Sequence, residues 1–256
     1  MNWPEYRWNP RTRQYHDDRG RFVPRKEVRR ALDSAIGKAT GRIARNALDL
    51  QAGKINLAQW QLNAERELKA IHVMSTALAS GGWAQVTTKD WAQAGRLIKA
   101  EYAYLARFAR ELENGLPLDG RFLVRAAMYA RAGHGTYETI LRRQERESGR
   151  VARERRITHS GNSCDPCIGY EAMGWQDPGV LPDTGDDCLC MSNCLCTFEY
   201  EYIGEEAEDD EPEEAPLETR SLAAPTRVRQ PSRMVQPGEM ISPGSVPPSA
   251  ATRSGR

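Results

Sequence analysis

The cysteines are the residues of this sequence whose type and spacing point most directly to chemistry. All six lie between positions 164 and 196, and none occurs among the first 163 residues. Cys164 and Cys167 form a Cys-x-x-Cys pair, which can aim two thiolates at one ion, and Gly169 permits a left-handed backbone that turns amides toward the sulfurs. In a reducing compartment such clustering favours metal over disulfide bonds. The sequence therefore predicts a structural zinc site in which this pair supplies two ligands.

The other two zinc ligands must come from the four cysteines between positions 188 and 196, because a structural zinc ion is tetrahedral. Cys188 and Cys190, or Cys194 and Cys196, lie two apart and would face one way on a strand, whereas Cys190 and Cys194 bracket a loop. We rank Cys194 and one of Cys190 or Cys196 above Cys188, which follows two aspartates. The candidate ligands are Cys164, Cys167, Cys190, Cys194 and Cys196.

Alternatives to this zinc site remain open at the level of sequence. His159 is a possible outside ligand, although a solvated linker histidine is the simpler interpretation. Two or three disulfides, or free thiols without metal, are the competing states, since a virion or secreted particle oxidises thiols after assembly. Zinc is favoured because about 45 residues with few large apolar side chains cannot build a core alone. Structural zinc contributes roughly 10 to 16 kcal/mol to folding such a module.

The region 25–156, which precedes this cysteine module, has the periodicity of helices. Apolar residues recur every three or four positions in stretches that start near Arg25, Asn56, Thr87 and Asp119. Their ends are predicted near Gly53, Gly81-Gly82 and Gly115, and a break in the last stretch at Gly133-His134-Gly135. We interpret the aromatic residues of these stripes as core, namely Trp60, Trp91, Tyr102 and Phe108.

The remaining segments complete the predicted organisation. Residues 1–24 form an extended basic arm with two short extended pieces around a glycine turn. Residues 142–156 carry seven basic and three acidic side chains and are predicted to continue the last helix into solvent, with a contact to nucleic acid as the alternative. Residues 204–256 hold nine acids between positions 205 and 218 and eight of the fifteen prolines between positions 212 and 256, which predicts a disordered tail.

These patterns give a mainly α fold class. We expect an N-terminal helical bundle or helical hairpins over 25–156, then a small zinc-ribbon-like β and loop module over 157–203, then the tail. The net charge of +1 gives no global argument for nucleic acid or membrane. No apolar run approaches the roughly 20 residues of a membrane span, and the polar start lacks a signal peptide. We therefore expect synthesis and assembly in a cytoplasm and no contact with membrane.

Enzyme motifs are missing from the sequence, which predicts that the chain is not an enzyme. It has no His-x-Glu partner for a deaminase zinc site, no Gly-x-Ser-x-Gly, no phosphate-binding Gly-x-x-x-x-Gly-Lys and no His-Glu-x-x-His. A thiol oxidoreductase would use Cys164 and Cys167, but its motif should follow a strand and open a helix, and turn-forming residues flank the pair here.

The cysteine module resembles a known family. Cys-x-x-Cys at 164–167, Gly174-Trp175, Leu181-Pro182, Gly185 and Cys-x-Cys-x-x-x-Cys-x-Cys at 188–196, followed by an aromatic and acidic strand, is similar to the C-terminal module of bacteriophage minor head, or head morphogenesis, proteins of the broad Mu F and SPP1 type. Further similarities lie in the first half, at Arg19–Val23, Gln59-Trp60, Gly81-Gly82, Asp90-Trp91, Tyr102–Leu105 and Tyr137-Glu138.

The resemblance covers roughly residues 15 to 200 and departs from the better-known branch of that family. That branch often ends in His-Pro-x-Cys-Arg-Cys, where this chain has Ser192–Cys196, so ligand roles do not transfer. It implies a low-copy virion protein that joins the phage head during assembly, oligomeric in the particle, with portal protein, capsid shell or packaged DNA as partners. The alternative is a nucleic-acid-binding or regulatory zinc ribbon whose basic segments contact phosphates.

Overall fold

The computed structural model describes residues 6–9, 12, 14–159, 161 and 163–204. The chain divides into two units, Met1–Glu208 and Asp209–Arg256, and all described residues belong to the first. The tail predicted at 204–256 lies outside the described residues, apart from Gly204. The predicted fold class is confirmed for the rest, since the described chain is mainly helical and ends in a small strand-containing region that carries the cysteines.

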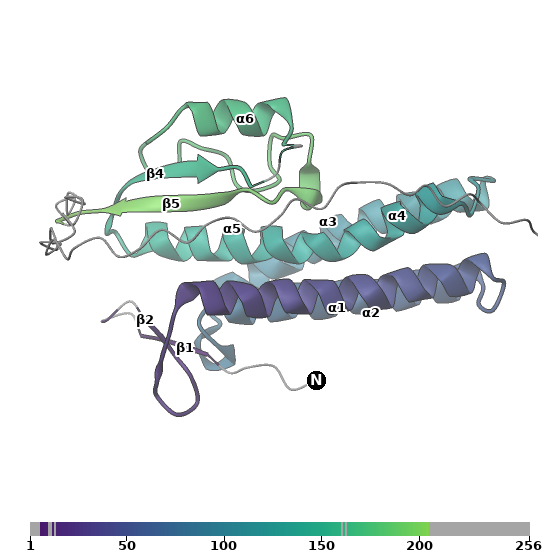
Figure 1. Ribbon diagram of the computed structural model, residues 1–256, viewed down its shortest axis with the longest axis horizontal. Coiled ribbons are helices and arrows are strands. Elements are labelled where there is room, and N and C mark those ends of the chain that lie inside the picture. The colour runs from purple at the N-terminus through teal and green to yellow at the C-terminus, as the bar shows by residue number, and fades with distance from the viewer. Residues whose placement is uncertain (1–5, 10–11, 13, 160, 162, 205–256) are drawn as a thin grey trace, which may run out of the picture. The chain divides into compact units, whose positions relative to one another are not determined.

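The helical body is built around α2. Its long elements are α1 (Arg25–Gln51), α2 (Leu57–Ala79), α3 (Thr88–Glu113), α4 (Gly120–Met128) and α5 (Ala132–Glu147), with a 3-10 turn, η1 (Trp83–Gln85), before α3. Helix α2 packs against α1, α3 and α5, while α4 packs against α1 (Figure 1). The buried stripes of these helices meet in one hydrophobic core. The body is thus a bundle that offers one face of α5 to the cysteine region.

Side chains at the helix starts satisfy backbone amides that have no partner within the helix. The Asn56 side chain accepts from Gln59 N at 2.8 Å, and Asp119 caps α4 in the same way. Thr87 and Asp90 form a reciprocal capping box at the start of α3. Such caps stabilise a helix by about 1 kcal/mol each and depend only on local sequence. This is why the starts predicted near Asn56, Thr87 and Asp119 agree with the observed ones.

The aromatic residues expected in the core divide into two groups. Trp60 and Phe108 are fully buried and meet edge to face with ring centroids 5.7 Å apart, and the half-buried Tyr102 packs against the same core. The expectation for Trp91 is wrong, because its side chain is 40% exposed and stacks on the equally exposed Trp83 at the edge of the bundle. Trp91 lies at the first turn of α3.

The break predicted at Gly133-His134-Gly135 lies elsewhere. The chain bends one turn earlier, in the 3-10 segment η2 (Tyr129–Arg131), and both glycines lie inside α5. Gly133 serves close packing instead, because a Cβ there would lie 2.6 Å from Ile71 Cγ1 of α2. The small residue therefore marks a helix crossing and not a helix end.

The segment predicted as an extended arm folds onto the bundle. Strands β1 (Arg7–Asn9), β2 (Gln14–His16) and β3 (Phe22–Val23) form an antiparallel sheet in the order β1-β2-β3. Tyr15 and Val23 are buried in the main core, and Trp8 N donates to Gly81 O at 2.9 Å. Gly81 has φ 81°, and a Cβ there would lie 2.1 Å from Trp8 Cβ, so the glycine permits this clasp.

The prediction of a solvated helix over 142–156 is wrong. Helix α5 ends at Glu147, the chain turns at Gly149 with φ 67°, and strand β4 (Val151–Ile157) pairs antiparallel with β5 (Thr197–Tyr202). The predicted boundary between 156 and 157 therefore falls inside β4. The high charge of the segment predicts side chains in solvent, but Glu154 and Arg156 are fully buried on one face of the strand.

The cysteine region is a layer on top of α5. Helix α6 (Asp165–Ala172) lies on one side of the β4–β5 ribbon and α5 on the other, as Figure 1 shows. The connection from α6 back to β5 contains a 3-10 turn, η3 (Met191–Asn193), and pairs with β4 at Gln176. The cysteines lie at the end of this layer where α6 begins and β5 starts.

Candidate metal centre

Helix α6 positions the first two cysteines. Cys164 is the residue before its first turn, and Cys167 lies three residues on, so the two thiols share one face of the helix. The predicted turn with a left-handed Gly169 is wrong, because Gly169 lies within α6. Amide groups at a helix start favour a nearby thiolate through the helix dipole. The pair is thus oriented by a helix N-terminus and not by a loop.

The other four cysteines come from the tight chain between α6 and β5. Gly185 has φ 96°, and a Cβ there would lie 2.8 Å from Met191 O, so only glycine permits this approach. Asp187 and Met191 also have positive φ. Cys194 N donates to Met191 O at 3.1 Å, which closes the turn that separates Cys190 from Cys194. These turns bring the thiols of this segment close to those of Cys164 and Cys167.

The six thiols form two overlapping groups. Cys164, Cys167, Cys188 and Cys190 have ligand atoms that all lie within 4.8 Å of one another, and Cys167, Cys194 and Cys196 form a second group by the same measure. Cys167 Sγ lies 3.7 Å from Cys194 Sγ. Two sulfurs bound tetrahedrally to one zinc at about 2.3 Å would lie about 3.8 Å apart. The spacing suits ligands of a shared ion, and all six cysteines are free thiols.

The structure brings together all five predicted ligands and adds a sixth. Cys164, Cys167 and Cys190 belong to the first group, and Cys194 and Cys196 belong to the second. Cys188 ranked lowest in the sequence because two aspartates precede it, yet it belongs to the first group. Its direction is set by the positive φ of Asp187, which residue spacing does not reveal.

His159 lies outside both thiol groups. Its Nε2 lies 2.7 Å from Thr197 Oγ1.

Arg156 is the residue of this site that the sequence analysis missed. It is fully buried, and its Nη2 donates to Cys194 Sγ at 3.2 Å and lies 3.7 Å from Cys167 Sγ. Glu154 and Arg156 are both buried, with the period of two that a strand has, whereas the sequence predicts a helix here. A guanidinium at this distance stabilises thiolate over thiol.

The thiol pKa values reflect these contacts. Burial raises the pKa of Cys164, but the Cys167 amide and the Cys190 thiol outweigh it and lower the pKa to about 6. The Cys196 thiol, with the Arg156 guanidinium, lowers the pKa of Cys194 to about 4, while burial opposes the shift. Each group thus has a sulfur that is held as thiolate, the form that binds metal.

A buried ion network joins this site to the helical body. Arg142 of α5 donates from Nη2 to Glu154 Oε1 at 2.6 Å and from Nη1 to Asp183 Oδ1 at 2.6 Å. The side chains of Arg142 and Glu154 are 1% and 0% exposed. Asp183 opens the cysteine-bearing loop, so one guanidinium ties α5, β4 and that loop together.

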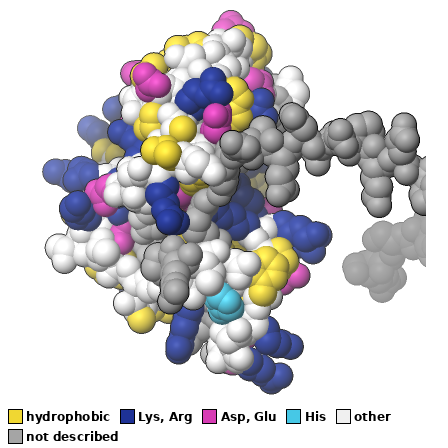
Figure 2. Space-filling view, turned by 90° about the vertical axis from the view of Figure 1, so that its left-hand side faces the viewer, with side chains coloured by type: hydrophobic (Ala, Val, Ile, Leu, Met, Phe, Trp, Pro, Cys, Tyr) yellow, Lys and Arg dark blue, Asp and Glu magenta, His cyan; other side chains and the backbone are white. Residues whose placement is uncertain are grey.

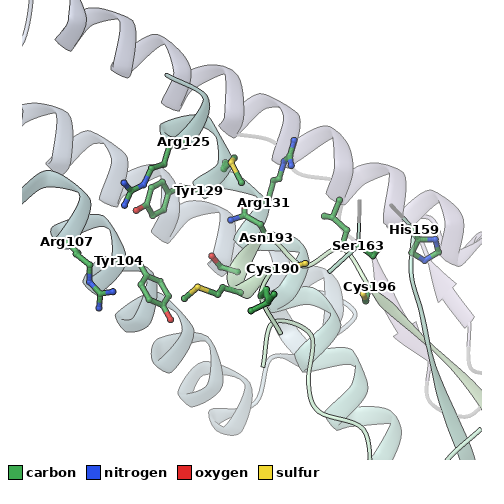
Figure 3. A pocket seen from close by; sticks show the side chains of 15 residues that line it. Tyr104, Arg107, Arg125, Tyr129, Arg131, His159, Ser163, Cys190, Asn193 and Cys196 are labelled. Carbon is green, nitrogen blue, oxygen red and sulfur yellow. The ribbon is translucent and has the colours of Figure 1, made fainter. Parts of the chain in front are cut away.

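A cavity of about 550 Å³ adjoins the thiols (Figure 3). Figure 3 shows Tyr104, Arg107, Arg125 and Tyr129 on its one side and Asn193, with the cysteines, on the other. Arg125 pairs with a glutamate of α3. Arg107 forms no ion pair within the described part of the chain, and Asn193 Oδ1 is buried there without a hydrogen-bond partner. The cavity is therefore lined by aromatic rings and positive charge.

Comparisons with known proteins do not identify the chain. No protein-family model matches it, and no curated protein or solved structure is detectably similar to it. None of the helices among the described residues has the length and apolar character that crossing a membrane requires. The arrangement of the thiols therefore has to be interpreted from its own chemistry.

Six convergent thiols can bind metal or exchange disulfides. The Cys164-x-x-Cys167 motif follows strand β4 and opens helix α6, so the sequence argument against an oxidoreductase, that turn-forming residues flank the motif, does not hold.

Proposed function

We propose that this chain is an architectural protein in which a thiolate-bound metal, zinc by its ligand chemistry, fixes the cysteine module onto a helical body. The observation that carries this proposal is the convergence of four thiols, from Cys164, Cys167, Cys188 and Cys190, at the spacing of one tetrahedral site. A catalytic zinc keeps one position open for water or substrate, whereas a four-thiolate site is closed. The site therefore favours structure over turnover.

The composition of the module's core supports a structural role for the metal. Among the described residues, the cluster of buried hydrophobic side chains at this site consists of cysteines alone. Neutral thiols are weak hydrogen-bond donors and pack like small apolar groups, so six of them form a poor core. Metal binding converts these contacts into bonds that contribute roughly 10 to 16 kcal/mol. The buried ion pair between Arg142 and Glu154 then holds the module against α5.

Metal analysis tests the structural role. Full-length protein purified without chelator under reducing conditions should contain bound zinc, and the double variant Cys167→Ser/Cys188→Ser, which removes two ligands of the four-thiol group, should lose it together with the folded module. A disulfide-exchange assay on the same sample should give no turnover. Fully paired cysteines in freshly made protein, or exchange activity that depends on Cys164, would refute the proposal in favour of redox chemistry.

We place this architectural role in the head of a tailed bacteriophage, at or near the portal or the capsid. The support is the order of cysteine, glycine and aromatic motifs, which resembles that of minor head and head morphogenesis proteins. A rigid helical body with a metal-fixed module is suited to holding a defined position between partner subunits. Mass spectrometry of purified proheads and virions tests this placement, and we expect a low-copy signal in one or both. Absence from both kinds of particle would refute it.

A second candidate function is nucleic-acid binding, which the cavity beside the thiols favours. Tyr104 and Tyr129 offer rings for stacking, and Arg107 and Arg131 offer positive charge. On the face that Figure 2 shows, the described lysine and arginine side chains are spread among acidic and hydrophobic ones, so the cavity is the more specific feature.

Salt-dependent binding of the purified chain to single-stranded and duplex DNA measures this function. The double variant Arg107→Ala/Arg131→Ala should weaken binding if the cavity is the site, whereas Arg30→Ala, which removes an exposed arginine of α1, should have a much smaller effect. Equal effects of these variants would remove the cavity from consideration.

A further inference from the structure

The two thiol groups overlap, and a single ion bound by the first group would leave two thiols without a metal. Cys167 Sγ is a member of both groups, and Cys194 and Cys196 remain beyond the four thiols that complete the first site. If only the first site held an ion, two buried thiols would pack against it without a ligand. Cys194 and Cys196 are 1% and 3% exposed, so they are as deeply enclosed as Cys167.

We propose that the six cysteines hold two metal ions in one cluster, with Cys167 and Cys188 each bound to both ions. Two tetrahedral ions need eight ligand positions, and six thiolates fill eight positions when two of them bridge. Cys164 and Cys190 then complete the first ion, and Cys194 and Cys196 complete the second. This inference rests on the proposed metal-binding role and extends it to the number of ions and the sharing of ligands.

Cys188 is assigned as the second bridging ligand because the second group supplies three thiols and a tetrahedral ion there needs a fourth. It belongs to the first group, in which its Sγ lies within 4.8 Å of Cys167 Sγ, the sulfur that the two groups share. Cys188 lies outside the second group, so the half-exposed turn that carries it must move to bring its Sγ into the second tetrahedron. The other candidate, His159, is turned to Thr197 Oγ1 and lies outside both groups.

The buried charge of Arg156 supports an ion in the second group. Arg156 is 0% exposed and forms no ion pair among the described residues, although the Tyr170 ring lies 5.2 Å from it and the Asp186 carboxylate interacts with its charge at longer range. A buried guanidinium without a close negative partner is unfavourable. Its Nη2 instead donates to Cys194 Sγ at 3.2 Å. Six thiolates with two divalent ions carry a net charge of −2, which gives Arg156 the partner that neutral thiols at Cys194 and Cys196 would not.

Metal stoichiometry of the full-length chain tests the cluster. After reconstitution with excess zinc under reducing conditions and removal of loose ions, native mass spectrometry should show two zinc ions per chain. The Cys196→Ser variant should keep one ion, because the first site retains its four thiolates. One ion in the unaltered chain, with Cys196→Ser unchanged, would overturn the cluster and leave the proposed structural role standing. Absence of any ion would overturn both.

Cadmium substitution tests the bridging itself. In protein loaded with ¹¹³Cd, two resonances should appear in the range of all-thiolate sites and should show coupling between the metals through a shared sulfur. Cys196→Ser should reduce them to a single uncoupled resonance, and the control Ser34→Ala, at an exposed serine of α1, should leave both in place. Two resonances without coupling would overturn the shared ligands.

Discussion

Removing the buried guanidinium of Arg142 should weaken the attachment of the cysteine module to the helical body and lower the free energy of unfolding. Arg142 donates to both carboxylate oxygens of Glu154, at 3.1 and 2.6 Å, to Asp183 at 2.6 Å and to the Leu181 carbonyl at 2.5 Å. In Arg142→Met, the fully buried Glu154 would keep only the Gly179 amide as a donor, at 2.8 Å. Breaking such a pair from one side costs about 3 to 5 kcal/mol.

The measurement is the free energy of unfolding of the metal-loaded full-length chain, from denaturant titration followed by circular dichroism. Arg153→Met is the matched control, because Arg153 lies on β4 beside Glu154 and pairs with Glu201 where the side chains are 51% and 39% exposed. That exposed pair should contribute no more than about 1 kcal/mol. The double variant Arg142→Met/Glu154→Leu should recover part of the loss, because it leaves no unpaired buried charge. Equal losses for Arg142→Met and Arg153→Met would refute the reasoning.

Three further predictions concern other parts of the molecule. Burial raises the pKa of Glu101 from 4.5 to about 7, so the folded state binds a proton that the unfolded state has lost, and the free energy of unfolding should fall as pH rises between those values. Glu101→Gln should abolish this fall and raise the free energy of unfolding at pH 8 by about 3 kcal/mol. Glu113→Gln is the control. Arg156→Leu should weaken metal retention about 10- to 100-fold in chelator competition. Gly133→Ala should cost about 1 to 3 kcal/mol in thermal unfolding because its Cβ would meet Ile71, whereas Gly135→Ala, with its nearest contact at 3.8 Å, should cost little.

The helices could be predicted because their signals are local. Asn56, Thr87 with Asp90, and Asp119 cap helices through atoms two or three residues away, so the sequence alone shows where α2, α3 and α4 begin. The buried face of a long helix likewise repeats within its own residues. Trp91 departs from that pattern because its burial depends on what lies opposite the first turn of α3, which the sequence does not show.

The joint between the body and the module could not be predicted, because its charged residues are buried by partners far along the chain. Arg142 pairs with Glu154 and with Asp183, which is 41 residues away. A segment of seven basic and three acidic side chains suggests solvent unless those pairings are known. The membership of Cys188 was hidden for a similar reason, since backbone turns at Gly185 and Asp187 set its direction. The other five cysteines were predictable from clustering and spacing alone.

Hydrogen exchange before and after metal removal tests the central claim most directly. With zinc bound, backbone amides of α6, β4 and β5 should be protected in the full-length chain. After chelation under reducing conditions, we expect these elements to lose protection while α1, α2 and α3, whose core contains no thiol, keep theirs. Unchanged protection of α6, β4 and β5 in the metal-free protein would contradict the account, because the module would then fold without the ion.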